Sequence, residues 1–195
     1  MKIQVILGST RQGRITERLA KWIATEAGKI DDFEVEIVDL ADYDLPFFIE
    51  AISPRYNPNP QHPEAVVRLT TKLSEADGYV IATPEYNHSI PAVLKNMFDY
   101  LTSEIAKKPV LIASHGSVGG ARAAEHLKAI LLEAGAAVVS KAVAMHGASE
   151  LLDENGVFLG DATAPYNQVI LLGFSLAELR WWTETLQYGR STFKA

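Results

Sequence analysis

Five short apolar runs recur along the chain, and each is followed by a segment long enough to form a helix. The apolar runs cover residues 3–7, 33–40, 78–83, 109–113 and 136–143. The helical patterns cover residues 14–28, 63–75, 89–105, 120–134 and 167–188. Alternation of this kind is typical of a parallel sheet with helices on both faces. The sequence therefore predicts an α/β fold, a doubly wound three-layer sandwich, with the run 33–40 near an edge.

The composition suits one globular domain and excludes several classes of function. Of the 195 residues, 48% are apolar, which is enough for a sizeable core, and the net charge of −6 argues against a nucleic-acid partner. The chain has no Cys, so disulfides and thiolate chemistry are excluded and redox chemistry would need a bound cofactor. No signal peptide or apolar span of 18 residues is evident, so we expect a cytoplasmic protein without a membrane partner.

The first strand-to-helix turn has the composition of an anion site. Gly8 ends the apolar run, and the helical pattern begins near Arg14. Backbone N–H groups and the helix dipole favour a phosphate at such a turn. Additional donors are available from the side chains of Ser9, Thr10, Arg11 and Thr16. The alternative is a surface turn whose Ser and Arg side chains only cap a helix.

Two familiar phosphate motifs are absent from this turn. Gly8 and Gly13 have the spacing of a Walker A loop, but Arg14 and Ile15 replace the Lys and the hydroxyl that binds magnesium. The GxGxxG pattern of dinucleotide-binding folds is also missing. The turn therefore favours a phosphate that is held but not transferred, as on a mononucleotide cofactor.

Two more loops are rich in Gly, Ser, Asn and other polar residues. They are residues 84–89 (PEYNHS) and 114–120 (SHGSVGG), which follow the third and fourth predicted strands. In the strand order 2-1-3-4-5 these loops and the first one meet at the carboxyl edge of the sheet. The sequence therefore predicts one binding site made from three loops.

Four motifs, GSTRQGR (8–14), TPEYNHSIPAVLKN (83–96), GGARAAEHL (119–127) and AELRWWTETLQYGR (177–190), carry a family resemblance. With them the chain resembles the NADPH-dependent FMN reductase family, flavodoxin-like proteins that include NAD(P)H:quinone and chromate reductases. The resemblance implies a five-stranded parallel sheet in the order 2-1-3-4-5. The first motif departs from the usual form, because Arg14 replaces a Ser and the next hydroxyl is that of Thr16.

The resemblance also implies an activity. FMN would be the cofactor, NADPH or NADH the reductant, and a free flavin, quinone, azo compound or metal oxyanion the small-molecule acceptor, in a ping-pong reaction. It further implies a homodimer or homotetramer. The alternative from another class is a non-enzymatic flavodoxin-type electron carrier or a flavin redox sensor.

Roles for individual residues follow from the resemblance in the same way. No catalytic side chain is expected, because hydride reacts at flavin N5. Arg11 and Arg14 are also candidates for contacting the 2′-phosphate of NADPH, which would favour NADPH over NADH. The cofactor-binding set comprises Ser9, Thr10, Arg11, Arg14 and Thr16 near the phosphate, Pro84, Glu85, Tyr86 and Asn87 along one ring edge, and Ser114, His115, Gly116, Ser117 and Gly119 at the pyrimidine end.

Simpler interpretations stay open for several residues. Glu85 could be only a surface carboxylate. His88 and His115 could stack near the flavin or be solvated. Arg122 could serve the cofactor phosphate or only add a solubilising surface charge. The chain has no HExxH motif or carboxylate cluster, so a metal site is not expected. A Ser117 hydrolase is disfavoured because His115 replaces the first Gly of GxSxG.

Two regions outside the loops are candidates for contacts with substrate or subunit. Five of the nine prolines lie between Pro46 and Pro63, together with Phe47 and Phe48. We expect this stiff segment to wall the site or to pack on a neighbouring subunit, and the alternative is an ordered surface loop. The apolar faces of the predicted helices at 90–101 and 171–186 are larger than one copy of the chain readily buries, which favours contact with another subunit. The alternative is ordinary core packing.

Overall fold

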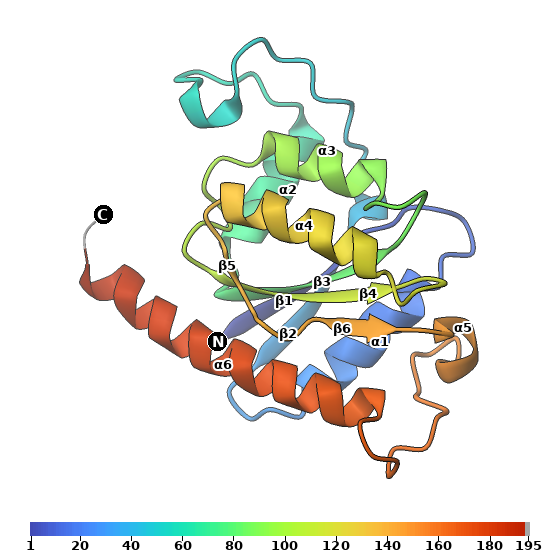
Figure 1. Ribbon diagram of the computed structural model, residues 1–195. Coiled ribbons are helices and arrows are strands. Elements are labelled where there is room, and N and C mark those ends of the chain that lie inside the picture. Colours follow the sequence, from blue (N-terminus) through green and yellow to red (C-terminus); the bar gives the residue numbers. More distant parts are fainter. Residues whose placement is uncertain (194–195) are drawn as a thin grey trace.

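All strands of the sheet are parallel and follow the order β2-β1-β3-β4-β5, with β6 also paired to β4 (Figure 1). The structure is a computed structural model that describes residues 1–193. The strands are β1 (Lys2–Leu7), β2 (Glu34–Asp39), β3 (Gly78–Pro84), β4 (Pro109–His115), β5 (Ala137–Val138) and β6 (Val143–Met145). The flavodoxin-like fold and its strand order are confirmed.

Helices cover both faces of the sheet. The α-helices are α1 (Thr16–Ala27), α2 (Glu64–Ser74), α3 (Ala92–Tyr100), α4 (Ala121–Glu133), α5 (Ala148–Leu151) and α6 (Gln168–Thr192). Two short 3-10 helices, η1 (Leu40–Asp42) and η2 (Pro54–Tyr56), follow β2. Helices α2, α3 and α4 lie on one face, and α1 and α6 lie on the other (Figure 1). None of the helices in residues 1–193 is long and apolar enough to cross a membrane.

The strands are apolar on both sides because both faces are buried. In β1, Ile3, Val5 and Leu7 pack into the core beneath α1 and α6, whereas Ile6 packs into the core beneath α2, α3 and α4. Adjacent side chains of a strand point to opposite faces, which explains this alternation. At the edge of the sheet, β2 is only partly buried, as its mixed apolar and charged pattern predicts.

The prediction of one continuous fifth strand over residues 136–143 was wrong. The chain forms β5 and β6 instead, and both pair with β4. Between them, the backbone N–H and the hydroxyl of Ser140 donate to the Glu178 carboxylate of α6, at 3.0 and 2.8 Å. This side-chain acceptor replaces a strand partner, so the chain leaves the sheet at a polar position within an apolar run.

The third helix is shorter than the predicted range of 89–105, because it begins at Ala92 and ends at Tyr100. Pro91 is the N-cap residue, and Ser89 instead exchanges backbone hydrogen bonds with Tyr86. The helix ends at Tyr100, because the Glu104 carboxylate accepts the N–H groups of the two residues after Leu101. A capping carboxylate four residues beyond the helix thus ends it before residue 105.

The proline-rich segment, residues 46–63, packs over α3 and α4. The Asn96 side chain donates to the Pro46 oxygen at 2.8 Å and accepts the Phe48 N–H at 2.9 Å. Tyr100 also donates to the Pro46 oxygen, and Arg55 donates to a backbone oxygen near the end of α4. These contacts attach the segment to the helical layer, while Phe47, Ile49 and Tyr56 remain exposed.

Gly120 provides a test of how closely the third loop packs. It has a φ of +76°, and an added Cβ would lie 2.7 Å from the Ser114 Cβ and 2.8 Å from the His115 nitrogen. We expect Gly120→Ala to lower the free energy of unfolding by roughly 2–5 kcal/mol, from backbone strain and overpacking together. Chemical denaturation measures the change.

Gly13→Ala is the matched control for Gly120→Ala. Gly13 has a similar φ of +66°, but no heavy atom lies within 4 Å of a Cβ placed there. This variant should lose only about 1–2 kcal/mol, the strain of a left-handed backbone. Equal losses in the two variants would contradict the packing argument.

Candidate active site

The three polar loops lie side by side where β1, β3 and β4 end. Leu7 is in register with Ala82, and Pro84 is in register with His115, so the three strands end at the same edge. The carboxyl edge of such a sheet is where doubly wound folds bind ligands. The predicted convergence of the three loops is therefore present.

Gly8 brings the first loop close to the third strand. Its N–H donates to the Ala82 oxygen at 2.9 Å, and an added Cβ would lie 2.9 Å from that oxygen and from a methyl group of Leu94. Any side chain at this position would push the loop off the sheet. The loop then turns outward, with Ser9 buried and Thr10 and Arg11 exposed.

Arg14 ties the first loop to the edge strand. Its guanidinium donates to the Ser9 oxygen at 2.7 Å and forms an ion pair with Asp39. Only 13% of the Arg14 side chain is exposed. Sequence reasoning missed Asp39, although the predicted topology already placed the end of β2, where Asp39 lies, beside the end of β1.

Three side-chain contacts join the loops in a closed ring, which we call the loop ring. Ser9 Oγ bonds to Tyr86 Oη at 2.9 Å and links the first loop to the second. The Glu85 carboxylate accepts the Arg122 N–H at 3.1 Å and pairs with the Arg122 guanidinium, linking the second loop to the start of α4. The contact that closes the ring is between Thr16 Oγ1 and His115 Nε2, at 2.8 Å.

Glu85 is a structural anchor and not a free surface carboxylate. Only 5% of its side chain is exposed, and its backbone N–H donates to the His115 oxygen at 2.9 Å. The Arg122 guanidinium lowers the pKa of the Glu85 carboxyl, which keeps it ionised. This negative charge lies at the start of α4, where it also interacts favourably with the positive end of the helix dipole.

Asn87 and His88 form a strained turn at the tip of the second loop. Their φ angles are +48° and +74°, and Tyr86 and Ser89 exchange backbone hydrogen bonds across them. This is a two-residue hairpin turn in which both central residues are left-handed. Ser89 also contacts His126 of α4, at 2.9 Å. The strain is of the kind often found at functional sites.

The third loop folds back tightly onto β4. The buried Ser114 hydroxyl donates to the Gly119 oxygen at 2.8 Å, and Gly119 has a φ of +69°. Ser117 is exposed at the tip of the loop, and within residues 1–193 no hydrogen bond joins its hydroxyl to an imidazole. The geometry therefore gives no support to a serine hydrolase.

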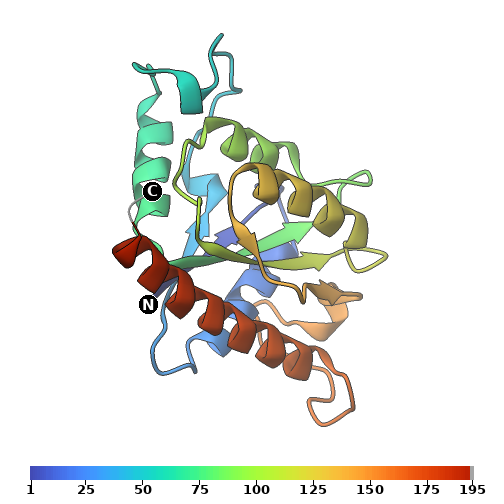
Figure 2. The same cartoon turned by 60° about the vertical axis from the view of Figure 1, so that its left-hand side comes forward.

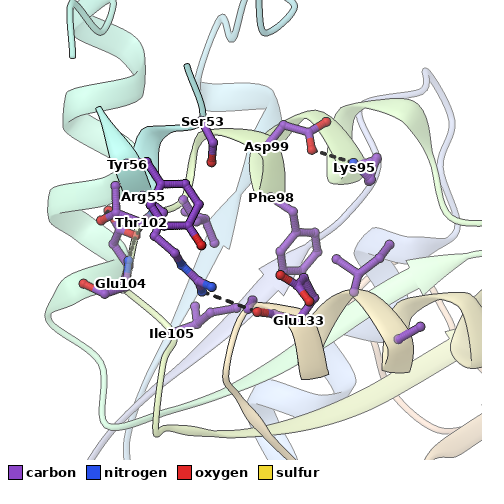
Figure 3. A pocket seen from close by; sticks show the side chains of 15 residues that line it. Ser53, Arg55, Tyr56, Lys95, Phe98, Asp99, Thr102, Glu104, Ile105 and Glu133 are labelled. Carbon is purple, nitrogen blue, oxygen red and sulfur yellow. Dashed lines mark hydrogen bonds and ion pairs between the residues drawn. The ribbon is translucent and has the colours of Figure 1, made fainter. Parts of the chain in front are cut away.

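The described residues hold no metal cluster. Across residues 1–193, no group of three or more His, Asp and Glu side chains could hold an ion. The cavity of about 420 Å³ in Figure 3 is also separate from the three loops, and its lining includes Tyr56, Phe98, Ile105 and Glu133. It lies between the proline-rich segment and the C-terminal ends of α3 and α4, and in it Arg55 reaches the Glu133 oxygen.

Comparison with known proteins identifies the family. The family model described as NADPH-dependent FMN reductase matches residues 1–150.

The chain belongs to this family.

Individual relatives agree with the family assignment. A quinone reductase from Escherichia coli K12 is 36% identical over 155 residues, which cover 75% of this chain and 78% of the relative. An NAD(P)H-dependent FMN reductase from Schizosaccharomyces pombe is 38% identical over 127 residues, which cover 65% of this chain and 64% of the relative. The chain spans between 47% and 64% of the length of three of the curated relatives it matches.

A solved structure extends the likeness to nearly the whole fold. FerB, a flavoenzyme NAD(P)H:(acceptor) oxidoreductase from Paracoccus denitrificans, has a TM-score of 0.71 and 26% sequence identity. The alignment covers 94% of this chain and 97% of that chain.

FMN is the group that the family implies, and the first loop has donors suited to its phosphate. Within residues 1–193, the backbone N–H groups of Thr10, Gln12 and Gly13 have no protein acceptor. The side chains of Thr10 and Arg11 are exposed beside them, and the Arg11 guanidinium lies 5.6 Å from the centre of the Tyr86 ring. A cation with several free N–H donors at the start of a helix fits a phosphate dianion.

His115 gives the site a pH-dependent stability. Burial lowers its pKa to about 4, whereas an unfolded chain has a His pKa near 6.5. Between these pH values the unfolded chain binds more protons, so the free energy of unfolding should fall as pH drops from about 6.5 to 4. The expected fall is on the order of 3 kcal/mol, and the full contribution is present above pH 6.5.

The measurement compares the unfolding free energies of the native protein and His115→Gln across this pH range. The variant should lack the His115 component of the pH dependence. His126→Gln, which removes an exposed imidazole from α4, controls for the loss of a histidine as such. Identical pH profiles for the native protein and His115→Gln would refute the buried neutral imidazole.

Proposed function

We propose that this chain is an FMN-dependent NAD(P)H oxidoreductase that reduces a small-molecule acceptor. The observation that carries the proposal is the loop ring, which holds three polar loops at the ligand-binding edge of a flavodoxin-like sheet. Bound FMN would supply hydride acceptance and donation at N5. A ping-pong sequence follows if NAD(P)+ leaves before the acceptor enters the same site.

The first loop is proposed to bind the FMN phosphate. Thr10 and Arg11 provide exposed donors, and Arg14 holds the loop through Ser9 and Asp39. Ser9 and Thr16 are buried, and their hydroxyls lie against Tyr86 and His115. When Tyr86 and His115 act as the donors, each of these hydroxyls keeps its own proton for a phosphate oxygen.

The other two loops are proposed to border the flavin ring. Pro84 to Asn87 would run along one edge, with their position set by the Glu85–Arg122 pair. Ser114 to Gly119 would approach the pyrimidine end, where backbone N–H groups at the start of a helix stabilise negative charge on a reduced flavin. In this arrangement the protein orients the reactants and needs no side-chain acid or base.

Nicotinamide preference and the acceptor are finer parts of the proposal. Arg11 is the better candidate for the 2′-phosphate of NADPH, because its side chain is exposed while Arg14 is paired with Asp39. Quinones and azo compounds are the proposed acceptors, since relatives are named for quinone and azo reduction. We propose a homodimer or homotetramer in the cytoplasm.

An anaerobic titration of the FMN-loaded, gel-filtered protein with NADPH tests the activity. The flavin absorbance should co-elute with the protein and bleach with about one equivalent of NADPH, because one hydride reduces one flavin. Flavin bands that persist would favour an electron carrier or sensor. Protein that retains no flavin would refute the FMN site.

Arg11→Ala tests the phosphate role separately from the flavin ring. Loss of a charge-assisted contact should weaken FMN binding about 10-fold or more while leaving riboflavin binding unchanged. Fluorescence quenching of each flavin measures the two affinities. Lys29→Ala is the control, because it removes an exposed cation that pairs with Glu26 at the end of α1. Equal loss of FMN and riboflavin binding would argue against a phosphate contact.

A further inference from the structure

Lys108 differs from the other lysines of the chain in its surroundings. Of the nine lysines in residues 1–193, six pair with a carboxylate, and Lys107 and Lys141 are exposed to water. Lys108 is the only one of these nine that is partly buried and forms no ion pair with a carboxylate. A lysine that is buried without a counter-charge is unusual, because an ammonium group is costly to remove from water.

Lys108 lies where the ends of α2 and α6 meet the start of β4. Its Nζ donates to the oxygen of Ser74, the last residue of α2, at 3.0 Å. Near the end of α6, Arg190 donates to the oxygen of Lys107 at 2.9 Å. Figure 2 shows the last turns of α6, in dark red, just below the lower end of α2. The amine is thus at the end of the sheet opposite to the three polar loops.

The two oxygens around Lys108 Nζ match the donors of a neutral amine. Besides the Ser74 oxygen, Tyr79 Oη accepts from Nζ at 3.2 Å, because its own proton is donated to the Leu73 oxygen. A neutral amine has two N–H groups, whereas an ammonium group has three. When both N–H groups are bound, the lone pair of the neutral amine takes the remaining direction, in which residues 1–193 supply no hydrogen-bond partner.

The charged groups near Lys108 also favour the neutral amine. Burial and the Arg190 guanidinium lower the pKa of the Lys108 amine to about 8, although Asp77 and Glu104 act in the opposite direction. Both carboxylates have other partners, since Asp77 pairs with Arg190 at 3.4 Å and Glu104 accepts the Thr102 N–H. At pH 7.5 about a quarter of such an amine is neutral, against about 0.1% for an ordinary lysine.

We propose that Lys108 is a modification site that is acylated by a small anionic donor of the acyl phosphate class. The neutral Nζ attacks the carbonyl carbon of the donor. The new C–N bond forms as the C–O bond to the phosphate breaks, and the phosphate leaves with that electron pair. The nitrogen then loses one proton to water, so the product is an uncharged amide with one N–H.

An anionic donor and an uncharged product both suit this position. The exposed ammonium group of Lys107 and the guanidinium of Arg190 lie beside Lys108, and both attract a phosphate group. The amide removes a positive charge from the neighbourhood of Arg190 and from a half-buried position, which lowers the cost of burial. Its single N–H still reaches one of the two oxygens of Ser74 and Tyr79.

Reaction of the full chain, loaded with FMN, with acetyl phosphate at pH 7.5 tests the proposal. Mass spectrometry of peptides measures the initial rate of acetylation at each lysine and separates these from the amino group of Met1. Lys108 should react about 10-fold faster than Lys107 or more, because only the neutral amine is a nucleophile. Lys107 is the matched control, since it is the preceding residue, is more exposed and likewise forms no ion pair with a carboxylate. Equal rates at the two lysines, or a faster rate at Lys107, would overturn the proposal.

The pH dependence of the same reaction provides a second measurement. The rate at Lys108 should rise with pH and level off above about pH 8, where the amine is fully neutral. The lysine of a short unstructured peptide is the reference, and its rate should continue to rise to about pH 10. A rate at Lys108 that follows the peptide up to this pH would overturn the proposal.

Discussion

The loop ring is the constraint on which the site depends. Each of its three loops contains a residue with a demanding backbone position: Gly8 has no room for a Cβ, and Asn87 and Gly119 are left-handed. A single hydrogen bond contributes only about 1 kcal/mol, but three contacts that close a ring restrict every loop relative to the other two. Sites of this kind bind rigid planar ligands well because the geometry exists before the ligand arrives.

The charges around the loops are arranged so that an anion is favoured locally on an acidic protein. The carboxylate of Glu85 is neutralised by Arg122, and that of Asp39 by Arg14. Burial keeps His115 neutral at physiological pH. What remains is the exposed Arg11 and the unpaired N–H groups of its loop, so the local field is positive although the whole chain carries −6.

Sequence reasoning predicted the strands and the three loops because both depend on local patterns, whereas the order of the strands was implied by the family resemblance. Apolar runs and turn residues reveal strands and their ends, and a parallel topology then brings those ends together. The Glu85–Arg122 pair could not be predicted from the sequence, because its two residues are 37 positions apart and meet only through the geometry of their side chains. The split of the fifth strand was missed for the same reason, since Glu178 of α6 competes for Ser140.

The turn at Asn87 and His88 breaks the backbone preference of its own residues, because both adopt the left-handed conformation beside the candidate site. Natural sequences are mostly consistent with their folds at the local level, so a departure of this kind is expected where the chain meets something outside itself. The strained turn lies where the ring of a ligand is proposed to bind. The cost of the turn is therefore explained by the position that it gives to the second loop, which the Glu85–Arg122 pair and the Ser9–Tyr86 hydrogen bond hold in place.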